Sequence, residues 1–409
     1  MVARVSSGVI DPVSDRILTR RFSILWLVGF SSYASVYLLI PVLPLYLQQR
    51  GMTATAIGSL LGLMSLAALF TRPFSGWLSD GLGRKPLITA GLAGLLVFTL
   101  GLPFIAGALV FAILRLISGV GWGCLTSNAN TLAGEMAPPG RQGEAIGHYT
   151  MAGSVAFAGA PAVGLFLIHR YGYHAAFWAA AGLTTLALVL SAFLERRPPT
   201  PLRPFSAGNL ITWNAVGPAA VLMLHAMTYG GLITFLPLLA RDRDLGDPSL
   251  FFTIYALALV VIRGTAGRLS DRFGRPAVIG PGLATGGLAL LILAFATARW
   301  HMLGSALLFS FSMGFVQPPS LAWGLDLSGG QRGVAMATMV AAQDMGIAVG
   351  GAVLGFIGTQ AGFGALFGAA AGVSLMALLG LLALARSSRV SAAPLPGLSR
   401  RRRKGASKE

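Results

Sequence analysis

Ionisable residues are rare inside the apolar segments of this chain, and they are the first candidates for chemistry. Asp344 lies well inside the apolar stretch 333–360, and Arg115 lies inside the stretch 107–134. A charged side chain in the hydrocarbon of a bilayer costs about 2.5–3.5 kcal/mol on insertion scales. Each such residue is therefore a hypothesis for a functional site.

Asp344 is the deepest carboxylate, because a rise of about 1.5 Å per residue places it near the middle of a spanning helix. A carboxylate in a cavity of low dielectric can take up and release protons near neutral pH as the cavity alternately hydrates. We therefore predict that Asp344 carries protons, with hydrogen bonding to neighbouring helices as the structural alternative. His225 is a second candidate for proton coupling, although a buried neutral imidazole also serves structural roles.

The elements that would position these residues are membrane-spanning helices. Of 409 residues, 55% are hydrophobic and 11% are charged, whereas about 25% of a soluble domain is charged. The apolar runs are continuous and approach the roughly 20 residues that cross a bilayer, so they predict helices and not the alternating strands of a β-barrel. We predict an all-α membrane protein with twelve transmembrane helices, at 22–47, 54–79, 86–105, 107–134, 143–169, 174–194, 211–240, 248–270, 277–297, 301–327, 333–360 and 362–385.

The formal net charge of +17 could indicate a nucleic-acid partner, so the placement of the 30 Lys and Arg residues is decisive. Most of them fall in the loops and tails of one side, which is the asymmetry of the positive-inside rule. The charge therefore predicts topology and no nucleic-acid binding. We expect a multi-pass protein of the cytoplasmic (inner) membrane, in contact with the lipid bilayer, with both termini in the cytoplasm.

An internal repeat divides the chain into two halves of the same orientation. The segment 72–84 recurs at 263–275, at an offset of 191 residues, and 172–182 recurs at 362–372. We predict two pseudo-symmetric six-helix bundles at 22–194 and 211–385. A proline-rich cytoplasmic linker at 195–210 joins them, and cytoplasmic tails at 1–21 and 386–409 flank them; the second tail is basic.

The repeated segment contains the pattern Gly-x-Leu-x-Asp-x-x-Gly-Arg in both halves. The residues that carry it are Gly76, Asp80, Gly83 and Arg84, and Gly267, Asp271, Gly274 and Arg275. This loop after the second and eighth helices resembles the signature of the major facilitator superfamily, and the resemblance covers nearly the whole chain. In that family the loop braces the outward-open state, which implies a conformational gate here. The alternative is that these loops only fix topology.

Two further charges repeat near the ends of the fourth and tenth helices. Glu135 and Asp326 occupy matching positions, and each is followed six residues later by an arginine, Arg141 or Arg332. We predict two symmetric charge pairs that join the halves in one state and part in the other. A static role at the surface is the alternative.

Arg115 begins an Arg-x-x-x-Gly pattern that is similar to one in drug/proton antiporters of this superfamily, where the arginine is implicated in proton coupling. The matching position of the second half is Ala306, so the fold itself does not require an arginine there. The fifth helix carries Pro161 and Gly164 in a partial form of the antiporter motif, with Ala160 where the motif has glycine. The resemblance thus favours efflux.

By analogy with the family, helices one, four, seven and ten should line a substrate cavity. Their polar and aromatic candidates, besides His225, are Tyr33, Tyr37, Asn128, Asn130, Tyr229, Gln317 and Trp323. Such groups suit small amphipathic solutes. The first helix has no acidic residue between Arg21 and Gln48, which favours a neutral, zwitterionic or anionic substrate over a strongly cationic one.

An enzyme is not expected, because the sequence has no phosphate-binding Gly-Lys-Ser/Thr loop and no cluster of metal ligands. We expect no cofactor, no metal and a monomer whose partners are a small-molecule substrate and protons. The predicted function is secondary active transport, as proton-coupled efflux of a small organic molecule by alternating access. The alternatives are proton-coupled uptake of a sugar or organic acid and, less favoured, a lipid flippase.

Overall fold

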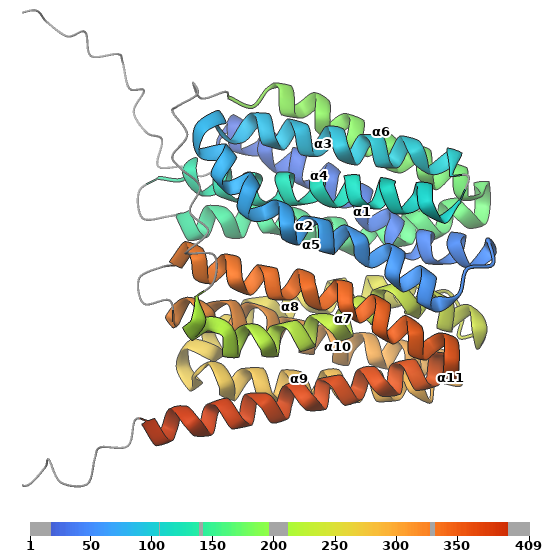
Figure 1. Cartoon of the computed structure of the whole chain (residues 1–409), viewed down its shortest axis with the longest axis vertical. Helices are drawn as coiled ribbons and strands as arrows, with labels where there is room; N and C mark the ends of the chain where they lie inside the picture. The colour runs from blue at the N-terminus through green and yellow to red at the C-terminus, as the bar shows by residue number, and fades with distance from the viewer. Residues whose placement is uncertain (1–17, 106, 139–141, 196–211, 328–331, 392–409) are drawn as a thin grey trace, which may run out of the picture.

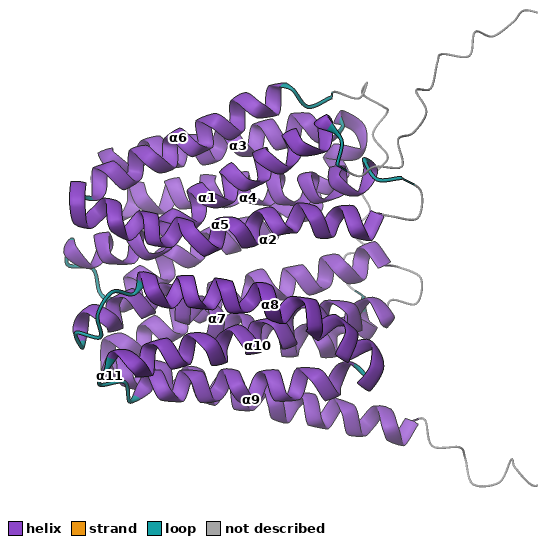
Figure 2. Cartoon of the chain, turned by 180° about the vertical axis from the view of Figure 1, so that it is seen from behind, coloured by secondary structure: helices purple, strands orange, loops and turns teal. Residues whose placement is uncertain are grey.

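The computed structural model describes residues 18–105, 107–138, 142–195, 212–327 and 332–391. Most of the predicted linker and both predicted tails lie outside these residues. Throughout the described part of the chain the regular structure is helical, without strands (Figure 2). The predicted all-α class is therefore confirmed.

The first half contains six long helices, α1 (Arg20–Gln49), α2 (Ala54–Leu82), α3 (Arg84–Gly101), α4 (Ala108–Glu135), α5 (Gln142–Tyr171) and α6 (Tyr173–Ala192). The second half contains α7 (Val216–Asp242), α8 (Ser249–Phe273), α9 (Arg275–Ala294), α10 (Arg299–Asp326) and α11 (Arg332–Ser391). Gly362, at φ 79°, divides α11 into two helices, so the spans number twelve in the described residues. Nine helices there, counting α11 once, are long and apolar enough to cross a membrane, and α8 has a further apolar stretch at Ser249–Ile262.

The tightest turns in both halves depend on glycine. Gly83 and Gly274 connect α2 to α3 and α8 to α9 at φ 83° and 90°, a backbone conformation that residues with a Cβ rarely adopt. Gly172 and Gly362 do the same at the other ends of the bundles, at φ 83° and 79°. These four positions are repeated in the sequence, so the duplication is also a duplication of turns.

The two halves lie one above the other with their helices side by side (Figure 1). We call the end with the turns at Gly83 and Gly274 the paired-loop end, and the end with Gly172 and Gly362 the opposite end. At the opposite end one apolar cluster includes residues of both halves, among them Leu39, Phe157 and Phe235. At the paired-loop end the buried clusters are separate, one in the first half and three smaller ones in the second. The halves are therefore packed together at the opposite end and parted at the paired-loop end.

Helices α2 and α11 form the tightest contact between the halves. A Cβ atom on Gly58 would lie 1.8 Å from the carbonyl oxygen of Gly351, so only glycine allows the two backbones to approach this closely. Nearer the opposite end, the backbone N–H of Thr55 donates to Thr359 Oγ1 at 2.9 Å, and the two hydroxyls are also 2.9 Å apart. This crossing closes the opposite end.

Candidate functional site

A cavity of about 660 Å³ lies between the halves, on the side of this closure that faces the paired-loop end. Helices α1, α2, α4 and α5 of the first half and α7, α8, α10 and α11 of the second contribute to its lining. The charged side chains in the described lining are Arg72, Arg115 and Asp344. Two of these three were predicted from the sequence to be functional.

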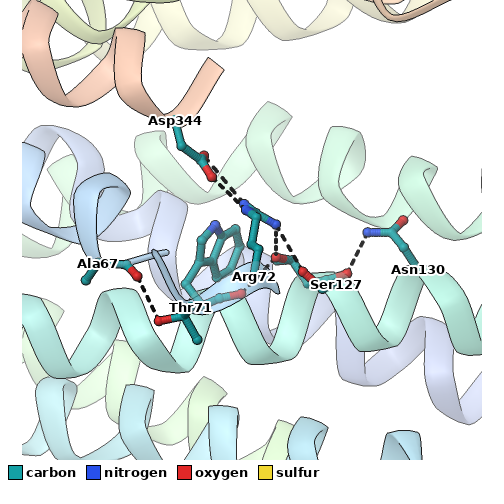
Figure 3. A network of polar contacts seen from close by, with 8 residues as sticks. Ala67, Thr71, Arg72, Ser127, Asn130 and Asp344 are labelled. Carbon is teal, nitrogen blue, oxygen red and sulfur yellow. Dashed lines mark hydrogen bonds and ion pairs between the residues drawn. The ribbon is translucent and has the colours of Figure 1, made fainter. Parts of the chain in front are cut away.

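Arg72 and Asp344 form an ion pair across the cavity, from α2 to α11 (Figure 3). Arg72 Nε donates to Asp344 Oδ2 at 2.6 Å, and Arg72 Nη2 donates to Oδ1 at 3.5 Å. The side chains are 20% and 11% exposed. The pair joins the two halves through a charge-assisted contact.

The remaining donor of this arginine points to α4, on the same side of the cavity. Arg72 Nη1 donates to Thr126 Oγ1 at 3.0 Å and to Ser127 Oγ at 3.4 Å (Figure 3). The hydroxyl of Thr126 in turn donates to the carbonyl oxygen of Trp122 at 2.8 Å. The guanidinium plane is therefore held by the first half, and Asp344 is its only described contact with the second half.

Arg115 lies in the same cavity without a carboxylate partner among the described residues. It is 8% exposed, its Nη2 donates to the carbonyl oxygen of Leu61 at 2.8 Å, and its guanidinium carbon lies 5.4 Å from the ring centre of Phe98. A carbonyl dipole and an aromatic ring stabilise a cation without neutralising it. Arg115 is thus a buried positive charge, and its predicted functional importance stays a prediction.

Four of the predicted cavity residues line the cavity: Tyr33, Tyr37, Tyr229 and Gln317. Asn128, Asn130 and Trp323 are not in the lining. Asn128 is 1% exposed and donates to Ser75 Oγ at 2.7 Å. Asn130 donates to the carbonyl oxygen of Thr126 at 2.8 Å, and Trp323 packs against an apolar cluster of the second half. Their helices are those expected. Asn128 and Trp323 pack elsewhere, whereas Asn130 lies one helical turn from Thr126, on the α4 face that contacts Arg72.

His225 is buried inside the second half and is not in the cavity lining. Its ring stacks on Phe309 with 6.0 Å between the ring centres, and neither ring nitrogen has a described hydrogen-bond partner. This placement separates it from Asp344 and gives no support to the second proton-coupling candidate.

The two loops form equivalent ion pairs, each within its own half. Arg84 Nε lies 3.3 Å from Glu135 Oε1, and Arg275 Nε lies 2.9 Å from Asp326 Oδ2, each pair 51 residues apart in the chain. Arg275 also pairs with Asp271. These pairings were not predicted from the sequence, although the equal separation in both halves was a signal that could have revealed them.

The remaining gate predictions are tested only in part by the described residues. Gly76 lies within α2, Gly83 and Gly274 form turns, and Arg141 lies outside the described residues. Gly267 lies within α8. Asp80 and Arg332 lie in helices whose backbones are described, but their side chains are not. The proposed pairing of Glu135 with Arg141 and of Asp326 with Arg332 stays a prediction.

The described residues contain no group of three or more His, Cys, Asp or Glu side chains that could hold a metal ion. Arg72 is the charged residue of the central site that was not predicted from the sequence. Its signal was its position, since it is one of four Lys or Arg residues that fall inside the predicted helices 54–79, 107–134 and 248–270. Arg72 completes an ion pair with Asp344 in this cavity.

Comparison with known proteins gives one family. The sequence model of the Major Facilitator Superfamily matches residues 25–246 and 218–406. The multidrug resistance protein MdtG of Citrobacter koseri is 26% identical over 302 residues, which are 69% of this chain and 74% of that protein. The MFS-type transporter MJ1560 of Methanocaldococcus jannaschii is 23% identical over 376 residues, 87% of this chain and 97% of that protein.

Among solved structures, the human organic anion transporter MFSD10 superposes with a TM-score of 0.66 and 20% identity, covering 90% of this chain and 99% of that one. At this identity the likeness concerns the fold alone.

Proposed function

This chain belongs to the Major Facilitator Superfamily of membrane transporters, which are not enzymes, and from that premise we propose that it exports a small organic molecule by proton-coupled alternating access. Transport of small molecules across a membrane follows from the family. The direction, the coupling to protons and the placement of both termini in the cytoplasm are the proposed parts.

The observation that carries the proposal is the Arg72–Asp344 pair. Among the described ion pairs it is the one that joins the two halves, and it lies in the central cavity. A proton on Asp344 removes the negative charge that faces Arg72. Since a ligand shifts a conformational equilibrium only through its different affinity for the two states, a proton that changes this link can change which state is favoured.

The packing of the halves supports alternating access. The opposite end is closed by α2 and α11, while the paired-loop end has separate cores in each half. With the paired-loop end in the cytoplasm, as the distribution of Lys and Arg predicts, the cavity is open to the inside. The Arg84–Glu135 and Arg275–Asp326 pairs, both within one half, suit a state in which the two loops are apart.

The efflux direction is supported by the name of the MdtG relative and by the partial motif at Pro161 and Gly164. In exchange with protons, or antiport, substrate and proton compete for the same site. A second candidate is uptake of an organic acid together with protons. It is favoured by the two arginines that face one carboxylate in the cavity, and it requires substrate and proton to bind together.

The test is flux in inside-out membrane vesicles with and without an imposed pH gradient. Asp344→Asn should transport independently of the gradient, because the amide keeps the shape of the side chain but cannot bind a proton. Asp242→Asn is the matched control, since Asp242 is an exposed carboxylate at the end of α7 and should behave as wild type. Undiminished gradient-driven flux in Asp344→Asn would remove Asp344 from the mechanism.

A further inference from the structure

We propose that the cavity binds amphipathic organic anions, and that Asp344 is a built-in counter-ion which such an anion replaces on Arg72 when Asp344 is protonated. This inference rests on the proposed role of Asp344 in proton coupling and adds the substrate class and the sign of the coupling.

The first argument is the charge of the cavity. Two guanidinium groups face one carboxylate, so the described lining carries an excess positive charge even when Asp344 is ionised. Among the described residues, the Arg115 guanidinium contacts the carbonyl oxygen of Leu61 and the ring of Phe98. In surroundings with little water this field repels organic cations and attracts anions.

The second argument is the geometry of Arg72. Its Nε and Nη2 donors both point to the carboxylate of Asp344, whereas Nη1 is used by Thr126 and Ser127 on its own half. A guanidinium edge that accepts one carboxylate can accept another carboxylate, a sulfonate or a phosphate in the same way. Asp344 thus occupies the place of a ligand anion.

The third argument gives the sign of the coupling. An incoming anion and the ionised Asp344 need the same N–H groups, so the anion binds best when Asp344 carries a proton taken from water in the cavity. By reciprocity, bound anion raises the affinity of Asp344 for protons. Proton and anion then cross together, which favours the second candidate, uptake of an organic acid together with protons, over exchange.

The other groups in the described lining do not reverse this coupling between proton binding and anion binding. The charged or titratable side chains that share the cavity are Arg72 from α2, Arg115 from α4, Tyr33 and Tyr37 from α1, Tyr229 from α7 and Tyr255 from α8. Phenols are neutral near pH 7. Helices α9 and α10, which also pack against α11, contribute no such group to the described lining. The proton that accompanies the anion is therefore bound at Asp344.

Aromatic rings define the body of the ligand. Tyr33 contacts Trp122 edge to face with 5.1 Å between ring centres, and Tyr37 contacts Phe157 at 4.9 Å in the same manner. All four rings line the cavity beside the arginines. Rings so arranged suit a planar apolar group attached to the anionic one.

The experiment measures binding to the purified full-length protein with three ligands that share one ring. Indole-3-propionate is the anion, indole-3-propionamide is neutral and tryptamine is the cation. We expect the anion to bind about tenfold or more tighter than the amide, which is the ratio that a hydrogen bond to a charged group typically gives. The anion should bind more tightly as the pH falls, and titration calorimetry in buffers of different ionisation enthalpy should record proton uptake.

Variants separate the roles of the two side chains. Asp344→Asn should bind the anion more tightly than wild type at high pH and lose the pH dependence. Arg72→Gln can leave a buried carboxylate without its partner. The double variant Arg72→Gln/Asp344→Asn therefore removes both charges of the pair, leaves Arg115 as the charge in the described lining, and should bind the anion more weakly than Asp344→Asn does. Asp242→Asn should match wild type.

Tighter binding of tryptamine, weaker anion binding in Asp344→Asn, or no binding of any ligand at millimolar concentration overturns the proposal. The proposal of proton-coupled transport and the proposal of an anionic ligand can be refuted independently. If flux depends on Asp344 but tryptamine binds best, the anion assignment alone is wrong. If the anion and proton bind together but vesicle flux ignores the pH gradient, proton-coupled transport is wrong.

Discussion

Replacing Gly58 with alanine should disfavour the state in which the opposite end is closed. The added Cβ would lie 1.8 Å from the carbonyl oxygen of Gly351 and 2.6 Å from its carbonyl carbon. A close C···O contact is about 3.3 Å, so the two helices must separate by about 1.5 Å at this crossing. Neither atom belongs to a flexible side chain that could turn away.

The expected cost follows from overpacking, which typically amounts to about 1–3 kcal/mol. Because the contact between Gly58 and Gly351 joins the halves, the cost falls on the state described here and not on one in which the opposite end opens. The equilibrium between the two should therefore shift by roughly 5- to 150-fold.

Disulfide trapping can measure this shift. The hydroxyls of Thr55 and Thr359 are 2.9 Å apart, so cysteines at both positions should cross-link readily when the opposite end is closed. Cys124, the only native cysteine, is first replaced by alanine. Gly58→Ala should then slow cross-linking. Gly368→Ala should not, because Gly368 lies in α11 with no atom within 4 Å of the added Cβ. Equal rates in the two variants, with both proteins folded, would refute this account of the closure.

Two further substitutions test the buried charges and the buried imidazole. Arg115→Gln should weaken binding of indole-3-propionate by about tenfold while the protein remains monodisperse in detergent, and unchanged affinity would show that this charge does not reach the ligand. His225→Leu should keep the dependence of vesicle flux on the pH gradient. It should also not lower the melting temperature, because the buried imidazole has lost its hydrogen bonds to water and has no described partner that replaces them. Loss of the gradient dependence in a folded His225→Leu protein would instead restore His225 as a proton-coupling residue.

The sequence predicted the helices well because long apolar runs and glycine turns are local signals. Eleven predicted spans match the helices or helix segments to within a few residues at most ends, and the kink at Gly362 separates the last two as expected. The seventh begins later, at Val216 instead of residue 211, since the residues just before it form a short 3₁₀ turn at Trp213–Ala215. The repeat also predicted matching turns, and the structure has them at Gly83 and Gly274.

The central site was predicted only in part, and the reason is physical. Asp344 and Arg115 could be recognised because charge is costly inside a membrane wherever it points. Which faces of α1, α4, α7 and α10 point into the cavity could not be predicted, since lipid and protein interior are both apolar and leave little amphipathic pattern. Asn128 and Trp323, predicted for the cavity, lie outside its described lining for this reason.

By itself, the sequence determined the number of spans, their pairing into two similar halves and the presence of buried charges, all of which depend on residue types along the chain. Only the tertiary structure decided that Asp344 faces Arg72, 272 residues away, and that the halves close at Gly58 and part at the paired loops. Such contacts depend on how each helix is rotated about its own axis and how the halves tilt against each other, and backbone packing between distant segments sets both.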